Sequence, residues 1–184
     1  MTASMVPVGR SFTLPTPLRF PAILRRPDPP APAPEVITVD IHRQPEWAAL
    51  DWQLAIRDLW RDHPTLCPSF KDKLKATGLL PRCCFLASLD NGPLIFRYIG
   101  EPTIAFLGRE WARYQLGKPD LDDPHQTLAE GVGAQYREAI EGGAPVFNRV
   151  MITGLSAEPK IYTHLLLGWR LPDGNRALLS CLDD

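Results

Sequence analysis

Hydrophobic residues in the segment PEWAALDWQLAIRDLWRDH recur every three or four positions, which is the spacing of an amphipathic α-helix. No helix breaker follows the first residue of this segment. Ser69, with Asp72 three residues later, then resembles a capping box that opens a second short helix, which Gly78 ends. The pattern predicts two consecutive helices within residues 46–80.

Two apolar runs of strand length follow, RCCFLASL and PLIFRYIG. Asp90-Asn91-Gly92 separates them, and Asn-Gly is among the strongest short signals for a β-hairpin. We therefore expect two antiparallel strands joined by a tight turn. EPTIAFLG then predicts one or two helical turns, and a connection rich in Gly, Pro and Asp extends through Asp123.

A longer helix is predicted between Asp123 and Gly142. Asp123 and Pro124 form a favourable N-cap and first-turn pair, and apolar residues then recur every four positions. Gly131 and Gly133 lie inside this helix and lower its intrinsic stability, so we expect close packing or a ligand at these positions. The recurring apolar residues are Leu128, Val132, Tyr136 and Ile140.

The chain ends in three predicted strands, VFNRVMITGL, KIYTHLLLGWRL and RALLSCLD, which are joined by short turn-forming segments. The resulting order is two helices, a hairpin, a short helix, a long helix and three strands. An antiparallel sheet with its helices on one face satisfies this order with short connections, so the predicted fold class is α+β. Residues 1–45 hold half of the 20 prolines and predict a flexible arm, although VITVDI within them alternates like a strand.

Charge and composition narrow the function classes. The 20 basic and 21 acidic residues nearly cancel, so we expect no partnership with nucleic acid or a membrane surface. No apolar run is long enough for a spanning helix, and the first 20 residues lack the apolar core of a secretory signal, so the expected location is cytoplasmic. The cysteines Cys67, Cys83, Cys84 and Cys181 do not have zinc-ligand spacing and are expected to be reduced, buried thiols.

The segment LIFRYIGEPTIAFLGREWARYQLGK, residues 94–118, resembles the second strand and following helical turns of PAS domains, in particular of small bacterial single-PAS proteins with leading helices. The element order of residues 46–183 resembles the same superfamily. The resemblance implies a five-stranded antiparallel sheet with helices on one face, preceded by two N-terminal helices and a Pro-rich arm. The implied organisation is an arm at 1–45, N-terminal helices at 46–80 and a sensory or interaction domain at 81–184.

PAS domains bind small molecules or cofactors between sheet and helices, or dock partners. The flavin-type light sensors carry a reactive Cys in an Asn-Cys-Arg-Phe-Leu-Gln sequence, which this chain lacks, so a flavin is not expected. Haem-binding members use an axial His on or near the long helix, and His125 is the one candidate. A His in a first helical turn is usually exposed, which argues against ligation.

Polar residues that interrupt the apolar strands are candidates for a ligand pocket, because a buried polar group requires a partner. The same residues are also compatible with the solvent face of a one-sided sheet, and the sequence leaves this open. Trp111 and Tyr114, interleaved with Arg109 and Arg113, have the composition of a binding surface and equally of a core. The strand candidates are Arg97, Tyr98, Asn148, Tyr162, His164 and Ser180.

The leading helix carries a stripe of large apolar residues that we consider a candidate dimer interface, because PAS dimers frequently pair through such a helix. Core packing is the alternative for this stripe. The residues are Trp47, Trp52, Ile56 and Trp60.

No catalytic motif is present: the chain has no G-x-S-x-G, H-E-x-x-H, P-loop or G-x-G-x-x-G sequence. Asp120, Asp122 and Asp123 are close enough in sequence to consider a divalent ion, but aspartates before a helix usually cap it. The predicted function is a non-catalytic regulatory module, a homodimer, that binds a small-molecule signal or a protein partner and acts in trans. Two alternatives remain: a cone-shaped enzyme of the nuclear-transport-factor-two or polyketide-cyclase kind that uses His164 with an acid, and a ligand-free structural dimer.

Overall fold

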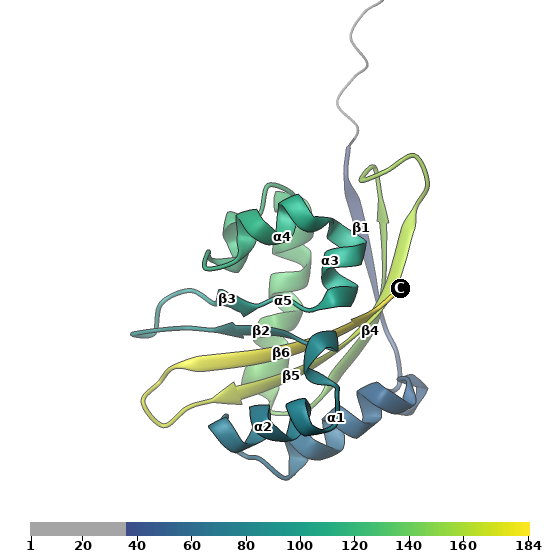
Figure 1. The fold of residues 1–184 in the computed structure, drawn as a ribbon. Coiled ribbons are helices and arrows are strands. Elements are labelled where there is room, and N and C mark those ends of the chain that lie inside the picture. Colours follow the sequence, from purple (N-terminus) through teal and green to yellow (C-terminus); the bar gives the residue numbers. More distant parts are fainter. Residues whose placement is uncertain (1–35) are drawn as a thin grey trace, which may run out of the picture. The chain divides into compact units, whose positions relative to one another are not determined.

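The computed structural model describes residues 36–184 of the chain. Within them, six antiparallel strands form one open sheet in the order β1-β4-β5-β6-β2-β3 (Figure 1). The hairpin β2–β3 joins the C-terminal meander β4–β5–β6 through the pairing of β2 with β6, in which Phe85 lies opposite Leu179. The strands are β1 Thr38–Arg43, β2 Cys84–Ala87, β3 Ile95–Tyr98, β4 Val146–Thr153, β5 Lys160–Arg170 and β6 Arg176–Asp183.

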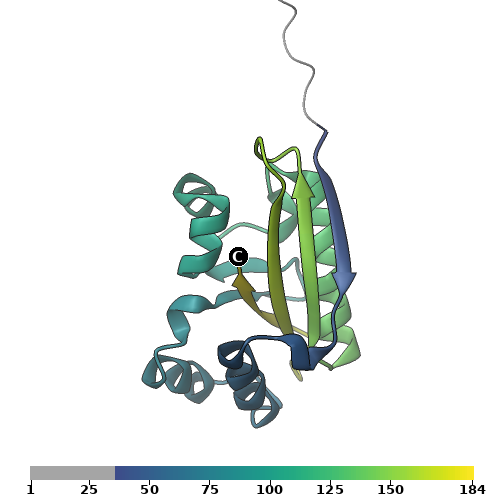
Figure 2. The same cartoon turned by 90° about the vertical axis from the view of Figure 1, so that its right-hand side faces the viewer.

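Five α-helices accompany the sheet in the described part of the chain. Two lie before the hairpin, and three lie between the hairpin and the meander. The longest, α5, runs lengthwise along β1, β4 and β5 (Figure 2). The helices are α1 Asp51–Arg61, α2 Pro68–Ala76, α3 Glu101–Leu107, α4 Arg109–Gln115 and α5 Gln126–Gly142.

Helices cover both faces of the sheet. On one face α3, α4 and α5 pack against even-numbered residues of the meander, such as Leu166 and Leu178. On the other face α1 and α2 pack against odd-numbered residues, such as Leu165 and Leu179. The α+β class is confirmed, but helices on a single face describe only α3, α4 and α5, because α1 and α2 form a second layer. The central strands β5 and β6 read as nearly continuous apolar runs because both of their faces are buried.

The sheet has six strands where five were expected. Residues 38–43, which the sequence assigned to the flexible arm, form β1 and pair along β4, with Ile41 opposite Val150. The alternation in VITVDI is the signal for this strand, because Val39 and Ile41 lie partly buried against the cluster that includes α5. The rest of the predicted arm, residues 1–35, lies outside the described part of the chain.

The connection expected before Asp123 contains a helix, α4, that the sequence reading missed. Gly108 separates α3 from α4 with φ of 98°, a conformation that favours glycine, so the two short helices follow one another across a sharp turn. The flanking glycines gave this segment the appearance of a loop. The predicted hairpin turn is present, with Asp90 and Asn91 as the two left-handed residues and Gly92 N–H donating to the Leu89 carbonyl.

The long helix begins two residues later than predicted, at Gln126, with His125 in place of Asp123 at its N-cap position. Asp123 still supports this end, because its Oδ1 accepts the backbone N–H of His125 at 2.7 Å. Within the described residues, no helix combines the length and apolar character needed to cross a membrane.

Close packing between α5 and the sheet occurs at Gly168 of β5. A Cβ atom built at this position would lie 2.5 Å from the Ile140 Cα and 2.6 Å from the Ala139 carbonyl carbon, so the helix backbone rests directly on the strand. Gly131 in α5 differs, because its nearest neighbours, from Val39 and Ile41, lie at an ordinary 3.7 Å.

This contrast gives a matched pair of variants. Gly168→Ala is expected to lower the free energy of unfolding by about 1–3 kcal/mol, because α5 must move off the strand. Gly131→Ala is expected to leave it unchanged or raise it by up to about 1 kcal/mol, through the higher helix propensity of alanine. Urea denaturation of both variants measures this difference, and equal effects of the two substitutions would contradict the direct contact at Gly168.

Candidate functional site

A small cavity lies between the sheet and helices α3, α4 and α5. Its volume is about 50 Å³. Because one water needs roughly 10–15 Å³ of such volume, the cavity has room for a few waters or a molecule of a few non-hydrogen atoms. Most of its wall is apolar, and Phe96, Phe106 and Leu128 belong to the surrounding core.

Polar side chains from four elements reach this cavity. The hydroxyl-bearing residues Tyr162 of β5, Ser180 of β6, Tyr136 of α5 and Thr103 of α3 line it, and each of these residues is at least nine-tenths buried. The hydrogen bonds among the described residues include none made by these four hydroxyl groups. None of the four oxygens is completely shielded, since the fully buried side-chain atoms without a partner in the described residues are Trp52 Nε1 and Gln115 Oε1. Water or a bound polar molecule in the cavity can therefore hydrogen-bond to the four hydroxyls.

Tyr136 and Tyr162 are hydrogen-bond donors at neutral pH. Burial raises the pKa of both phenols above their ordinary range, so both hydroxyls keep their protons. The Tyr162 ring is also fixed in place by edge-to-face contacts with Phe106, at 4.8 Å between ring centroids, and with His164, at 5.4 Å.

His164 also lines the cavity. A series of hydrogen-bonded side chains that leads to the surface determines which of its ring nitrogens carries the proton. Its Nε2 lies 3.0 Å from Nδ2 of Asn148, and an amide NH₂ group can only donate, so Nε2 is the unprotonated nitrogen and Nδ1 carries the proton. Asn148 Nδ2 also donates to Gln135 Oε1 of α5 at 3.1 Å. Burial, with a contribution from the Arg43 charge, lowers the pKa of His164 to about 3.

Arg43, at the end of β1, is the last side chain in this hydrogen-bonded series. Its Nε donates to Asn148 Oδ1 at 2.8 Å, and its terminal nitrogen donates to Gln135 at 3.1 Å and to Glu138 at 2.6 Å. The hydrogen bond from Arg43 lowers the pKa of the Glu138 carboxyl. The buried Asn148 amide thereby has partners for both its oxygen and its nitrogen, and the neutral form of His164 is held in a single tautomer.

The opposite end of the cavity is bordered by two carboxylates. Asp123 Oδ2 accepts from Trp111 Nε1 at 2.8 Å, which connects α4 to the start of α5. Burial raises the pKa of Asp120. Within residues 36–184, no three His, Cys, Asp or Glu side chains are grouped closely enough to hold a metal ion. Asp123 accepts hydrogen bonds from the Trp111 indole and from the backbone N–H of His125.

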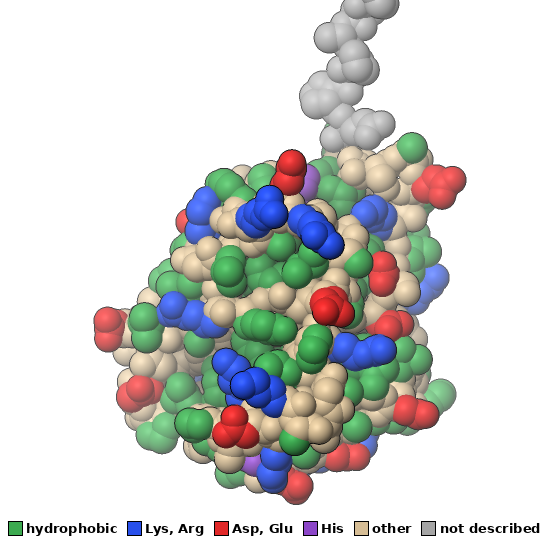
Figure 3. Space-filling view, in the orientation of Figure 1, with side chains coloured by type: hydrophobic (Ala, Val, Ile, Leu, Met, Phe, Trp, Pro, Cys, Tyr) green, Lys and Arg blue, Asp and Glu red, His purple; other side chains and the backbone are tan. Residues whose placement is uncertain are grey.

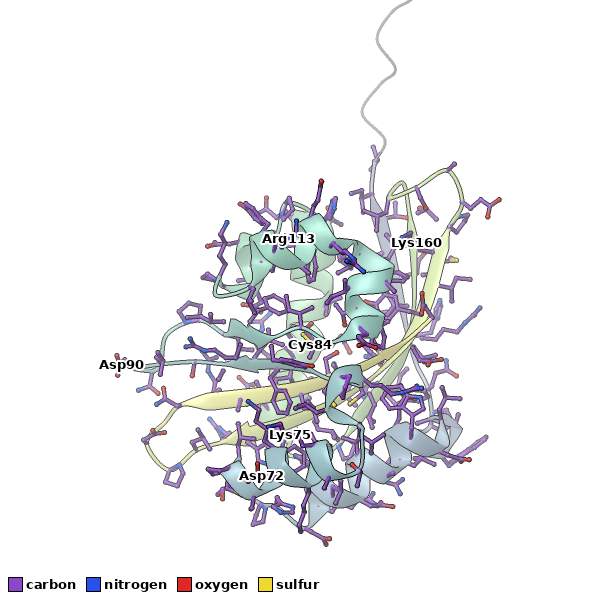
Figure 4. The ribbon with its side chains drawn as sticks, in the orientation of Figure 1. Asp72, Lys75, Cys84, Asp90, Arg113 and Lys160 are labelled. Carbon is purple, nitrogen blue, oxygen red and sulfur yellow. The ribbon has the colours of Figure 1, made fainter. Side chains whose placement is uncertain are left out.

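Five of the eight predicted pocket residues lie on the side of the sheet that α3, α4 and α5 cover. Trp111, Tyr162, His164 and Ser180 line the cavity, and Asn148 is the next member of the hydrogen-bonded series. The sequence left open whether the strand candidates face a pocket or solvent. Asn148, Tyr162, His164 and Ser180 are buried on a face of the sheet that helices cover. Cys84, on β2 in the middle of the view in Figure 4, lines the cavity as well, and burial raises the pKa of its thiol.

The other three predicted pocket residues lie elsewhere. Arg97 and Tyr98 border two hollows on the outer surface of β3, and a bulge in the pairing of β2 with β3 occurs beside them. Tyr114 is half-exposed, and the Lys118 ammonium lies 3.1 Å from the centre of its ring. His125, the haem candidate, is not among the residues that line the cavity, and a volume of about 50 Å³ does not accommodate a haem macrocycle.

The site contains several residues that the sequence reading did not select. Tyr136 was recognised only as part of the apolar face of the long helix, although its hydroxyl reaches the cavity. Thr103, Gln135 and Arg43 carried no usable signal, because their roles depend on contacts across more than ten residues or between separate elements.

The candidate dimer interface lies mostly inside the monomer. Ile56 is fully buried, and Trp60 packs edge to face on Trp169 and donates its Nε1–H to the Gly168 carbonyl at 3.2 Å. The Arg82 guanidinium lies over the Trp52 ring at 5.1 Å. Of the four residues in this stripe, Trp47 is the exposed one, at 79% of its surface.

Comparisons with known proteins give no relative: the chain matches no protein-family model, no curated protein and no solved structure.

The buried neutral His164 makes stability depend on pH. Its folded pKa, about 3, lies below the ordinary 6.5, so only the unfolded chain takes up a proton as the pH falls below 6.5. This group therefore lowers the free energy of unfolding as the pH falls, by about 2 kcal/mol between pH 7 and pH 5. Urea denaturation across this range is expected to show a weaker pH dependence in His164→Gln than in the wild type.

His42→Gln is the matched control, because His42 is exposed on β1. It is expected to keep the pH dependence of the wild type. Equal slopes for wild type and His164→Gln would show that His164 is not held neutral.

Proposed function

We propose that this protein is a non-catalytic regulatory module of the PAS type, which binds a small uncharged polar molecule in the cavity and signals through protein contacts in trans. The observation that carries the proposal is the cavity itself: four buried hydroxyls and a neutral histidine surround a space with room for a few non-hydrogen atoms. The element order supports it, with a hairpin, intervening helices and a three-stranded meander around a pocket between sheet and helices.

The charges around the cavity disfavour an anionic ligand. Asp120 and Asp123 line it, whereas no Lys or Arg does, and His164 is neutral. An anion would lose its hydration without gaining a cationic partner, at a high cost in free energy. The tyrosine hydroxyls, protonated by burial, and the Nδ1–H of His164 are donors for a carbonyl or hydroxyl oxygen.

The geometry does not favour the enzyme alternative. A pocket histidine acting as a general base needs an acid within hydrogen-bond reach and a pKa near the working pH. The partner of His164 is the Asn148 amide, and its pKa is about 3. A histidine in this environment positions a ligand as a fixed donor and is a very weak base.

The proposal is tested by thermal and urea unfolding of the full chain with acetamide, ethylene glycol or 2-propanol, and with acetate as the charged match for acetamide. At least one uncharged compound is expected to stabilise the fold, by about 2.7 kcal/mol at a hundred times its Kd, and acetate is expected to have no effect. Mass spectrometry of an extract of the freshly purified protein searches in parallel for a natural ligand.

Tyr162→Phe and Ser180→Ala serve as cavity variants. Each removes one hydroxyl and is expected to weaken ligand binding by about 1 kcal/mol, because one hydrogen bond is lost. A protein that yields no small molecule and gains no stability from any of the uncharged compounds would support the ligand-free alternative and contradict a sensory cavity.

A further inference from the structure

The outer surface of β3 borders an open groove that is separate from the cavity. Its other wall is formed by α3 and α4, and its volume is about 950 Å³. A second hollow of about 320 Å³, between β3 and α2, adjoins it, and Arg97 and Tyr98 line both. The two hollows therefore meet at Arg97 and Tyr98 on β3.

Cationic side chains surround this surface. Arg97 lies on β3, Arg109 and Arg113 lie one turn apart on the same side of α4, and Lys71 borders the hollow beside α2. We call the surface lined by these four residues the basic groove. Figure 3 shows Lys and Arg side chains over α3 and α4 and again lower on the same face, with hydrophobic side chains between them, and Figure 4 labels Arg113 on α4.

The three arginines have no anionic partner in the described residues. All three are exposed, and none takes part in a salt bridge or a side-chain hydrogen bond within residues 36–184. Glu101 is the one acidic residue that lines the groove, and it lies beyond salt-bridge distance of them. Arg43, Arg57 and Arg61 pair with carboxylates, whereas Arg149 and Arg170 are likewise without one in residues 36–184. What distinguishes this surface is the grouping of three such arginines around one groove.

The floor of the basic groove is apolar. Tyr98 and Ile104 are partly exposed there, and Leu116 exposes 53% of its surface at one end. An apolar floor between unpaired guanidinium groups fits a ligand that presents hydrophobic side chains together with carboxylates.

We propose that the basic groove binds a short acidic segment of a partner protein, with apolar side chains on the floor and carboxylates on Arg97, Arg109 and Arg113. A nucleic acid fits less well, because its hydrophilic phosphates would leave the apolar floor uncovered and the whole chain has a net charge of −1. The chain's own residues 1–35 are also a poor match in charge, with Arg10, Arg19, Arg25 and Arg26 against Asp28 and Glu35.

This inference rests on the proposed function in one respect, that the output is a protein contact in trans. The two sites are tested independently, because Tyr162→Phe in the cavity and Arg113→Glu in the groove change different surfaces. A groove that binds peptide in a protein with an empty cavity would leave the docking proposal standing and remove the sensory one.

The test is a selection of random twelve-residue peptides displayed on phage, with the full chain as the target. The enriched peptides are expected to combine Asp or Glu with Leu, Phe or Trp. Fluorescence anisotropy with the enriched peptide then measures its Kd. For Arg109→Glu/Arg113→Glu the Kd is expected to rise about tenfold or more, because the loss of one charge-assisted hydrogen bond is enough for that factor.

Arg149→Glu/Arg170→Glu is the matched control, since both arginines are exposed on β4 and β5 and neither lines the basic groove. It has the same change in net charge and is expected to keep the wild-type Kd. Circular dichroism and melting temperature verify that both double variants fold, and Arg97→Gln with Arg113→Gln is the milder substitute if they do not.

Three outcomes would overturn the proposal. The first is a selection that enriches no acidic peptide, and the second is an enriched peptide that binds the groove variant as tightly as the wild type. The third is a single-stranded oligonucleotide that binds the wild type more tightly than the peptide and loses this binding in the groove variant, which would identify the surface as a nucleic-acid site.

Discussion

The structure depends on the burial of both faces of β5 and β6 at the centre of the sheet. Helices α3, α4 and α5 cover one face and α1 and α2 cover the other, so a polar side chain in the buried central part of these strands is shielded from bulk water on either face. Each such group needs an internal partner, because an unpaired buried polar group costs about 1–3 kcal/mol. The positions of the polar residues in these strands therefore carry most of the information about the site.

Two solutions to this constraint are present. Asn148 and His164 are satisfied through a chain of side chains that ends at Arg43 on the surface, whereas the Tyr162 and Ser180 hydroxyls make no hydrogen bond within residues 36–184. Neither oxygen is among the fully buried unpartnered atoms, so both are open to the cavity, where water or a bound molecule can be their partner. This is the physical reason for regarding the cavity as a binding site.

Helix α4 belongs to both of the surfaces for which we propose a function. Trp111 lines the cavity and donates to Asp123, while Arg109 and Arg113 border the basic groove. The cavity and the basic groove therefore share one helix, whose Trp111 lines the cavity and whose Arg109 and Arg113 line the groove. Lys160, labelled in Figure 4, secures the neighbouring helix α3, because its Nζ donates to the Phe106 carbonyl at 2.6 Å.

Much of the fold was predictable from local patterns. The strands β2 to β6 lie within the apolar runs identified in the sequence, and the four-residue spacing from Leu128 to Ile140 marks the buried side of α5. Helix α4 was missed because Gly108 and Gly117 flank it, and β1 was assigned to the arm because a single edge strand carries a weak signal.

The site was predictable only in part, because its geometry depends on contacts between elements that are far apart in the sequence. Alternation along β5 places Tyr162 and His164 on one face, but it does not say which face a helix covers, and here both are covered. The partners of Asn148 cannot be found locally either, because Arg43 is 105 residues away in the chain. Arg97 and Tyr98 were wrongly grouped with the cavity residues, since strand alternation gives no information about the bulge beside them.

The measurement that tests the account most directly is a high-resolution crystal structure of the protein as purified, with attention to density inside the cavity. We expect ordered water or a small molecule within hydrogen-bond distance of the Tyr136 and Tyr162 hydroxyls, and a His164 ring with Nε2 toward Asn148. A cavity without density, or hydroxyls that pair with one another across a closed space, would contradict it.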